Sequence, residues 1–228
     1  MIKNHPTPNW IYFGGLTLAI TAGAINAVGF LGQHHQALSH MTGTATVLGM
    51  ELARTNYAVA LHAFSILTAF FVGCLVSGAI IRQSSLQLGR RYGVALSLES
   101  LLLLLAVYFL RQGAGVGDYL AAMACGLQNA MVTTYSGSTM RTTHLTGMVT
   151  DLGIACGHFL RGTAIDWFRF RIYGVLLLGY FAGAVLGSLG YERWGYDTLL
   201  LPALLSGVTG LSYTLYKHRQ HLRTKSAR

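Results

Sequence analysis

Charged residues are scarce in this chain. Aspartate, glutamate, lysine and arginine make up 10% of its 228 residues, whereas hydrophobic residues make up 53%. Soluble domains carry roughly a quarter of their residues as charged ones, so this composition excludes the ordinary soluble classes. Several apolar runs approach the ~20 residues that a helix needs to cross a bilayer. The sequence therefore predicts an all-α membrane protein with several spans.

Cysteine is also rare, and the three cysteines stand alone in apolar or glycine-rich stretches: Cys74, Cys125 and Cys156. Without a CxxC spacing, neither a zinc knuckle nor a redox pair is indicated. The histidines include the adjacent pair His34 and His35, but no HxxxH or HxxE pair at ligand spacing within one helix. We therefore expect no metal site and no other cofactor.

Acidic residues are the scarcer sign of charge, with seven against 16 lysines and arginines and a net charge of +9. The basic residues lie between apolar runs and in the tail 217–228, which suits an anionic cytoplasmic leaflet. We expect contact with membrane lipids and no nucleic-acid partner. The first eight residues are too short and polar for a cleavable signal peptide.

The clearest positive feature is a duplication. The segments His40–Gly49 and His144–Gly153 share the pattern His-x-Thr-Gly-x-x-Thr-x-Leu-Gly. Similar stretches precede and follow both copies: Ala22–Ala27 and Cys125–Ala130 before them, Phe71–Gly73 and Phe181–Gly183 after them. An internal repeat of this kind indicates a chain built from two related halves.

Six apolar runs are long enough, or nearly so, to cross a bilayer: 10–31, 57–81, 92–110, 119–134, 172–189 and 198–216. The two motif segments, which end near Arg54 and Leu160, are shorter, and each follows a polar break. The predicted organisation is a cytoplasmic N-terminus (1–9), a first membrane repeat (10–112), a second membrane repeat (113–216) and a basic cytoplasmic tail (217–228).

The basic residues decide between two topologies. If both motif segments crossed the bilayer, eight spans would result and the loop with Arg82, Arg90 and Arg91 would lie outside, against the positive-inside rule. If both segments return to the side from which they enter, six spans remain and the basic loops and tail lie inside. Three spans per half give the halves opposite orientations. We therefore expect about six transmembrane helices in two inverted three-span repeats, each with a short re-entrant or broken helix.

With both motifs considered, the chain resembles the YoaK-type family of six-span bacterial membrane proteins, which have no established biochemical role. The likeness covers residues 10–216 and is carried by four stretches: Ala22–Phe30, Ser39–Gly43, Gly126–Ala130 and Thr142–Gly147. Family members often have Asp at the position of Asn26 and Asn at that of Thr44. The resemblance implies a multi-pass protein of the bacterial inner (plasma) membrane, and the charge pattern predicts that both termini are cytoplasmic.

The repeated motifs supply the candidate site. Thr42 and Thr146 can cap the short helices by accepting a bond from a free backbone N–H, and the glycines that follow allow close approach. A helix N-terminus at membrane depth favours an anion or a carbonyl oxygen. In the alternative interpretation these residues only terminate and pack the short helices. The predicted substrate- or ion-binding residues are Asn26, His40, Thr42, Gly43, Gln128, Asn129, His144, Thr146, Gly147 and Asp151.

Polar side chains inside the spans are costly, and they are usually functional or paired. Asn26 and Asn129 either bridge helices or face a polar cavity. Asp151, in the second motif segment, is the first candidate for a proton or cation site.

Two further acids need partners. Glu51 lies near Arg54 at a segment end, which favours an interfacial ion pair. Glu99 lies in a leucine-rich run, and we expect a hydrogen bond between helices, with His62 as one candidate partner.

The favoured function is a small permease or channel-like transporter for a solute or an ion, with its site between the two His-x-Thr-Gly motifs. The alternative is a non-transporting scaffold or sensor whose motif residues only hold helices together. Intramembrane hydrolysis is the least favoured, because Ser136-Gly137-Ser138 is not a nucleophile signature, and we expect no enzyme activity. The many small residues on the helix faces are compatible with a homodimer.

Overall fold

The structure is a computed structural model that describes residues 9–81, 90–136 and 140–226. Within these ranges every regular element is a helix. In chain order they are α1 (Asn9–Leu31), α2 (Met41–Ala53), α3 (Tyr57–Ile80), α4 (Arg90–Arg111), α5 (Val116–Tyr135), α6 (Leu145–Leu160), α7 (Trp167–Trp194), the 3-10 helix η1 (Gly195–Leu199) and α8 (Leu200–Ser226). The predicted N-terminal segment and most of the Arg82–Arg91 loop lie outside the described residues.

By length and apolar composition, four stretches of the described chain can cross a membrane. They are Tyr12–Leu31, Tyr57–Ile80, Arg91–Arg111 and Trp167–Tyr216, the last covering α7, η1 and much of α8. Large apolar side chains are exposed on outward helix faces, among them Phe64, Leu178 and Leu201. Such faces are unfavourable in water and suit lipid contact. The prediction of an all-α membrane protein is confirmed.

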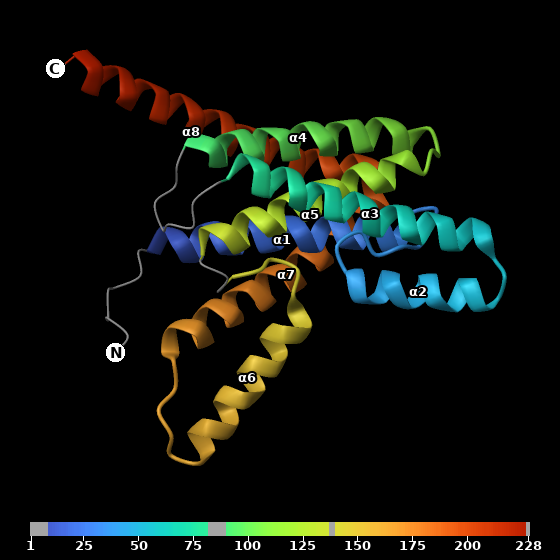
Figure 1. Cartoon of the computed structure of the whole chain (residues 1–228), viewed down its shortest axis with the longest axis horizontal. Helices are drawn as coiled ribbons and strands as arrows, with labels where there is room; N and C mark the ends of the chain where they lie inside the picture. Colours follow the sequence, from blue (N-terminus) through green and yellow to red (C-terminus); the bar gives the residue numbers. More distant parts are fainter. Residues whose placement is uncertain (1–8, 82–89, 137–139, 227–228) are drawn as a thin grey trace.

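The six longer helices form a bundle in which successive members run in opposite directions (Figure 1). Helices α1, α4 and α7 run one way, and α3, α5 and α8 run the other. The start of α1 and the end of α8 lie at the same end of the bundle, which we call the terminal end. The opposite end, where α1 ends and α3 and α5 begin, is called the distal end.

Glycines allow α1 and α7 to touch. A Cβ on Gly23 of α1 would collide with the carbonyl oxygen of Tyr180 on α7, and a Cβ on Gly183 of α7 would collide with that of Ile20 on α1. Small residues let helix backbones approach closely in membranes, where packing replaces the hydrophobic effect as the main attraction between helices. The two helices therefore meet backbone to backbone.

The contact between α3 and α5 is built in the same way. A Cβ on Gly126 of α5 would collide with the carbonyl oxygen of Phe70, and a Cβ on Gly73 of α3 with that of Met123. In sequence, Gly126 stands 103 positions after Gly23, and Gly183 stands 110 positions after Gly73. The two crossings thus use equivalent positions of the duplicated sequence. The first long helix of each half packs against the second long helix of the other half.

The third long helices, α4 and α8, pack against each other in opposite directions, with Gly93 against Gly210 and Ser100 against Gly207. Helix α4 also packs along α5. The equivalent pair, α8 and α1, barely touches. The two halves of the sequence are therefore alike in their glycine-lined helix crossings and differ in this contact.

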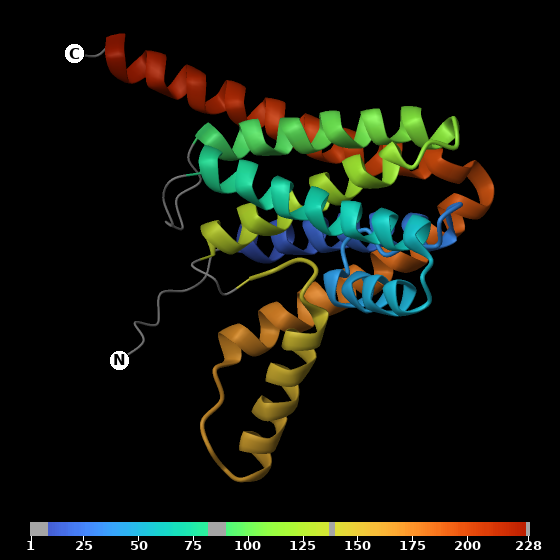
Figure 2. The ribbon, with the colours of Figure 1, turned by 45° about the vertical axis from the view of Figure 1, so that its right-hand side comes forward.

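The two short helices do not run the length of the bundle. After α1, the chain turns back from the distal end toward the middle of the bundle, and α2 returns to the distal end beside α3 (Figure 2). After α5, the chain turns back from the terminal end, and α6 returns toward that end beside the first turns of α7 while diverging from the bundle. The N-terminal ends of α2 and α6 lie near each other in both views.

Candidate functional site

The two His-x-Thr-Gly motifs have the same local structure. His40 and His144 are the N-cap residues of α2 and α6. Each imidazole packs over the glycine three positions later: a Cβ on Gly43 would lie 2.8 Å from Nδ1 of His40, and one on Gly147 would collide with the ring of His144. With any other residue at the glycine of the motif, the histidine ring would have to move from this position.

The predicted capping by Thr42 and Thr146 is wrong. The helices begin one residue earlier, at Met41 and Leu145, so that both threonines lie inside the first turn, and the N-cap histidines make no side-chain capping bond. The carbonyl groups of Thr42 and Thr146 instead accept bonds from threonine hydroxyl groups four residues later. The first N–H groups of both helices consequently lack a capping side chain, which leaves them available to a ligand or to water.

Asn26 bridges α1 to the segment that precedes the first motif. Its side chain is buried, and Oδ1 accepts hydrogen bonds from the backbone N–H and the hydroxyl of Ser39, both at 3.1 Å. Tyr180 of α7 lies beside Ser39. Of the two interpretations left open, the structure places Asn26 in a helix-bridging contact that holds the turn before α2.

The amides of the second half have different partners. Gln128 is fully buried, and its Nε2 donates to the backbone carbonyl of Leu18 at 2.9 Å, which ties α5 to α1. Its Oε1 and the Oδ1 of Asn129 are buried without a hydrogen-bond partner in the described part of the chain. Buried unpaired acceptors are uncommon and costly, so these two oxygens mark a polar spot within the bundle.

Asp151 lies on the exposed surface of α6, beside Tyr173 of α7. Together with His158 and Arg169 it lines a surface cavity of about 220 Å³ between α6 and α7. It is thus separate from the contact between Asn26 and Ser39. The predicted site residues therefore fall into groups that the structure does not bring to one point.

The other acids differ in outcome. The predicted pair of Glu51 and Arg54 is confirmed at 3.0 Å. Glu99 of α4 is fully buried beside Ser206 of α8, and neither carboxylate oxygen makes a well-aligned hydrogen bond within the described residues. The suggestion that His62 is the partner of Glu99 is wrong, because His62 lies near the distal end of α3 and faces α5.

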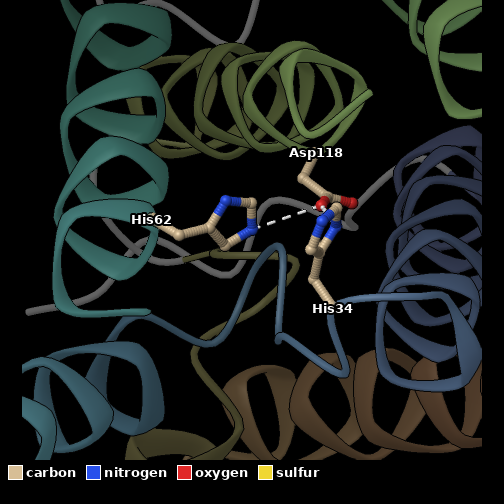
Figure 3. A group of neighbouring side chains, drawn as sticks. All are labelled: His34, His62 and Asp118. Atoms are coloured by element: carbon tan, nitrogen blue, oxygen red, sulfur yellow. Dashed lines mark hydrogen bonds and ion pairs between the residues drawn. The ribbon is translucent and has the colours of Figure 1, made fainter. Parts of the chain in front are cut away.

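His62 belongs to a cluster with His34 and Asp118 at the distal end (Figure 3). Nδ1 of His34 lies 2.6 Å from Oδ2 of Asp118, and Nε2 of His62 lies 3.3 Å from the same oxygen. The two imidazole rings are 4.5 Å apart between centroids. The hydroxyl of Tyr119 is 2.9 Å from Nδ1 of His62. Within the described ranges, these three side chains are the group whose ligand atoms lie close enough to share one cation.

The fold explains why these residues meet. His34 is in the turn after α1, His62 is in the second turn of α3, and Asp118 is in the first turn of α5, so all three lie where segments converge at the distal end. Gly115 leaves room for the rings, since a Cβ there would lie 3.2 Å from His62 and 3.6 Å from His34. Sequence spacing missed the cluster because its members are 28 and 56 positions apart. The available signal was topological: all three belong to loops or helix ends assigned to one side.

A cavity of about 270 Å³ lies between α1, α4, α5 and α8. Its walls are mainly apolar, with hydroxyl groups from Thr17 and Thr21 of α1 and from Ser206 and Thr209 of α8. The cavity occupies the space between α1 and α8. The equivalent helices, α4 and α5, leave no such space because they pack against each other.

Two equivalent glycines show the difference. A Cβ on Gly117 of α5 would collide with Leu110 and lie 2.9 Å from the carbonyl oxygen of Ala106, both on α4. Gly14 of α1, which stands 103 positions earlier, lines the cavity and has no atom within 4 Å of its Cβ position. Helices α4 and α5 are thus packed together at Gly117, whereas the equivalent helices α8 and α1 are separated by a gap at Gly14.

Comparison with known proteins adds a family to this geometry. Residues 14–212 match a family described as "Protein of unknown function (DUF1275)". The chain belongs to this family. The match covers both motifs, the helices from α2 to α7, most of α1 and the first half of α8. No curated protein and no solved structure matches the chain.

Proposed function

We propose that this DUF1275 protein is a six-span permease of a bacterial inner membrane, built from two inverted repeats, that moves a small solute by opening alternately to the two sides. The repeats are α1–α4 and α5–α8. Helices α2 and α6 are the re-entrant elements, and the cavity between α1 and α8 is the solute compartment. The scaffold or sensor remains the alternative.

The helix directions support the inverted arrangement. Each half contains three long helices of alternating direction, so that α5 starts at the end opposite to that where α1 starts. The reciprocal glycine contacts at equivalent positions support a common origin for the halves. Inverted repeats with discontinuous helices that meet near the midplane are a recurring plan of secondary transporters. The uncapped N-terminal ends of α2 and α6 lie outside the lining of the cavity and would offer N–H donors to a polar solute as it passes between the motifs.

The observation that carries the proposal is the unequal contact between equivalent helices. In an inverted pair of repeats, an interface that is closed on one side of the membrane and open on the other corresponds to one of two states that exchange by symmetry. The open interface beside Gly14 and the closed interface beside Gly117 are related in this way. A static scaffold has no need for this asymmetry.

The charge pattern supports an orientation in which the terminal end, and with it the open gap, faces the cytoplasm. The α6–α7 loop and the start of α7 carry Arg161, Arg169 and Arg171, and α8 ends in a basic segment. At the distal end, Arg54 and Arg111 are balanced by ion pairs with acids. Cytoplasmic loops carry the excess of basic residues in membrane proteins.

Glu99 is the residue that would bind a proton beside the cavity and couple proton movement to transport. It is fully buried, and it lies beside Ser206, whose side chain lines the cavity. An ionisable group at this depth is costly and marks an ion or proton pathway by default. This acid takes over the role predicted for Asp151, which is exposed on α6.

Cross-linking between α1 and α8 tests the proposal. Applied to α4 and α8, the offset of 110 positions that relates Gly73 to Gly183 places Tyr216 at the position of Ala106. Repeat symmetry therefore predicts that Gly14 meets Tyr216 in the opposite state, as Gly117 meets Ala106 in this one. In a chain without its native cysteines, Gly14→Cys with Tyr216→Cys should form a disulfide on oxidation in membranes, and the cross-link should stop solute flux into proteoliposomes. The two single variants are the controls. If the two cysteines never form a disulfide, the static scaffold is favoured.

Thiol labelling in intact cells tests the inverted topology. Ala53 is the last residue of α2 and Thr163 is in the loop after α6, and both are exposed. Ala53→Cys should react with a membrane-impermeant reagent from outside, and Thr163→Cys only after the membrane is opened. Labelling of both from one side would reject the inverted repeats.

A further inference from the structure

We infer that His34, His62 and Asp118 form a binding site for a divalent transition-metal ion of the Zn²⁺ class at the distal end of the bundle. The site is distinct from the cavity between α1 and α8, and it does not depend on the proposed transport. Its evidence is the spacing, orientation and chemistry of the three ligand atoms.

The spacing suits a tetrahedral ion. Imidazole nitrogens and carboxylate oxygens bind Zn²⁺ at about 2.0–2.2 Å, which places neighbouring ligand atoms of a tetrahedron about 3.3–3.6 Å apart. Nε2 of His62 and Oδ2 of Asp118 are separated by 3.3 Å. Nδ1 of His34 is 2.6 Å from the same oxygen, and the three atoms all lie within 4.8 Å of one another. Because 2.6 Å is shorter than the ligand separation of a tetrahedron, the His34 ring, which is on a turn, would rotate away from Asp118 to admit the ion.

The orientation of His62 is that of a metal ligand. Its Nε2 is buried and close to Asp118 without hydrogen-bond geometry. Its Nδ1 is held by the hydroxyl of Tyr119 at 2.9 Å. Metal-binding histidines almost always have the second ring nitrogen fixed by a hydrogen bond, which sets the tautomer and the ring direction. Tyr119 is therefore assigned as the positioning residue of the site.

The donor set selects the class of ion. Two imidazoles and one carboxylate suit Zn²⁺, Co²⁺ or Ni²⁺, whereas Mg²⁺ and Ca²⁺ prefer oxygen ligands throughout. Three protein ligands leave a fourth position for water or another ligand. The side chain of His34 is 31% exposed, against 13% for His62 and 7% for Asp118, so the site opens on the side of the α1–α2 turn.

Binding would join three parts of the chain. His34 is six positions before His40 of the first motif, while His62 and Asp118 anchor α3 and α5. An ion held by all three would therefore fix the turn that leads into the first motif against the two helices behind it.

Metal binding by the full-length chain in detergent tests the site, with a tag free of histidine and after removal of metals by a chelator. Competition with a chromophoric chelator should reveal one tight Zn²⁺ site per chain, and Co²⁺ should give the visible absorption of tetrahedral coordination. Asp118→Asn and His62→Ala should weaken Zn²⁺ binding at least 100-fold. Tyr119→Phe should weaken it by about 10-fold to 100-fold. His35→Ala, next to His34 but outside the cluster, should bind as the native chain does.

Thermal unfolding without metal identifies variants that fail to fold. Should His62→Ala fail, the nearly isosteric Asp118→Asn and Tyr119→Phe decide the question. The inference is overturned if the native chain binds no Zn²⁺ tightly, or if Asp118→Asn binds as tightly as the native chain. Either result would leave the cluster as a hydrogen-bonded link between segments. Because the readout is binding, a protein that transports nothing can still pass this test.

Discussion

The reciprocal glycines lead to a prediction with a matched control in the same helix. In Gly73→Ala, the new Cβ would collide with the carbonyl oxygen of Met123 and lie 2.8 Å from the backbone nitrogen of Leu127. No side-chain rotation relieves a clash with backbone, so α3 and α5 must separate. Gly78 of the same helix has no atom within 4 Å of its Cβ position, so Gly78→Ala meets no obstacle.

The two variants should change stability in opposite directions. Overpacking of a tight contact costs about 1–3 kcal/mol, and replacing glycine by alanine within a helix gains about 0.5–1 kcal/mol. Gly73→Ala should therefore destabilise the fold by up to about 2.5 kcal/mol, after the gain is subtracted from the cost. Gly78→Ala should stabilise it by about 0.5–1 kcal/mol.

Reversible unfolding in mixed micelles, followed by circular dichroism, measures both values. The reasoning is refuted if Gly73→Ala is as stable as Gly78→Ala. The equivalent comparison in α7 is Gly183→Ala, which meets Ile20, against Gly174→Ala, which meets nothing. Agreement between the two helices would support the equivalence of the two crossings.

Three further predictions concern polar groups. Asn26→Leu should cost about 1–3 kcal/mol in micelle unfolding, because it leaves the N–H and hydroxyl of Ser39 without their acceptor; Asn26→Asp, which keeps the oxygen, should cost less. Glu99→Gln should fold normally and abolish the dependence of proteoliposome flux on a pH gradient, and an unchanged dependence would remove Glu99 from the proton pathway. Arg111→Ala breaks the exposed ion pair with Asp197, whose nitrogen and oxygen are 2.6 Å apart, and should change the free energy of unfolding only slightly. Because salt screens exposed charges, the change should be smaller still at high ionic strength.

The hydrophobic runs predicted helix positions well where composition alone decides. The run 57–81 became α3 (Tyr57–Ile80), because in a bilayer a helix is the only single segment that satisfies its own backbone. The run 172–189 underestimated α7, which begins at Trp167 because Asp166 accepts hydrogen bonds from the backbone N–H groups of Phe168 and Arg169. A capping side chain extends a helix beyond its apolar part.

Candidate residues were harder to assign than helices. The duplication correctly marked two segments with one local structure, in which His40 and His144 pack over glycines. The pattern could not tell which residue is the N-cap, because a shift by one position is decided by how the chain enters the helix. Asn26 was recognised as polar within a span, but its partner, Ser39, depends on the path of the turn before α2.

The sequence by itself determined the membrane class, the approximate extent of several apolar helices and the duplication, since these depend on local composition and on similarity along the chain. Only the tertiary structure decided which helices touch, which of two equivalent gaps is open, and that His34, His62 and Asp118 meet. These features depend on contacts between residues far apart in the chain. The physical reason is that a helix presents several faces of similar apolar character, and packing against its neighbours selects among them.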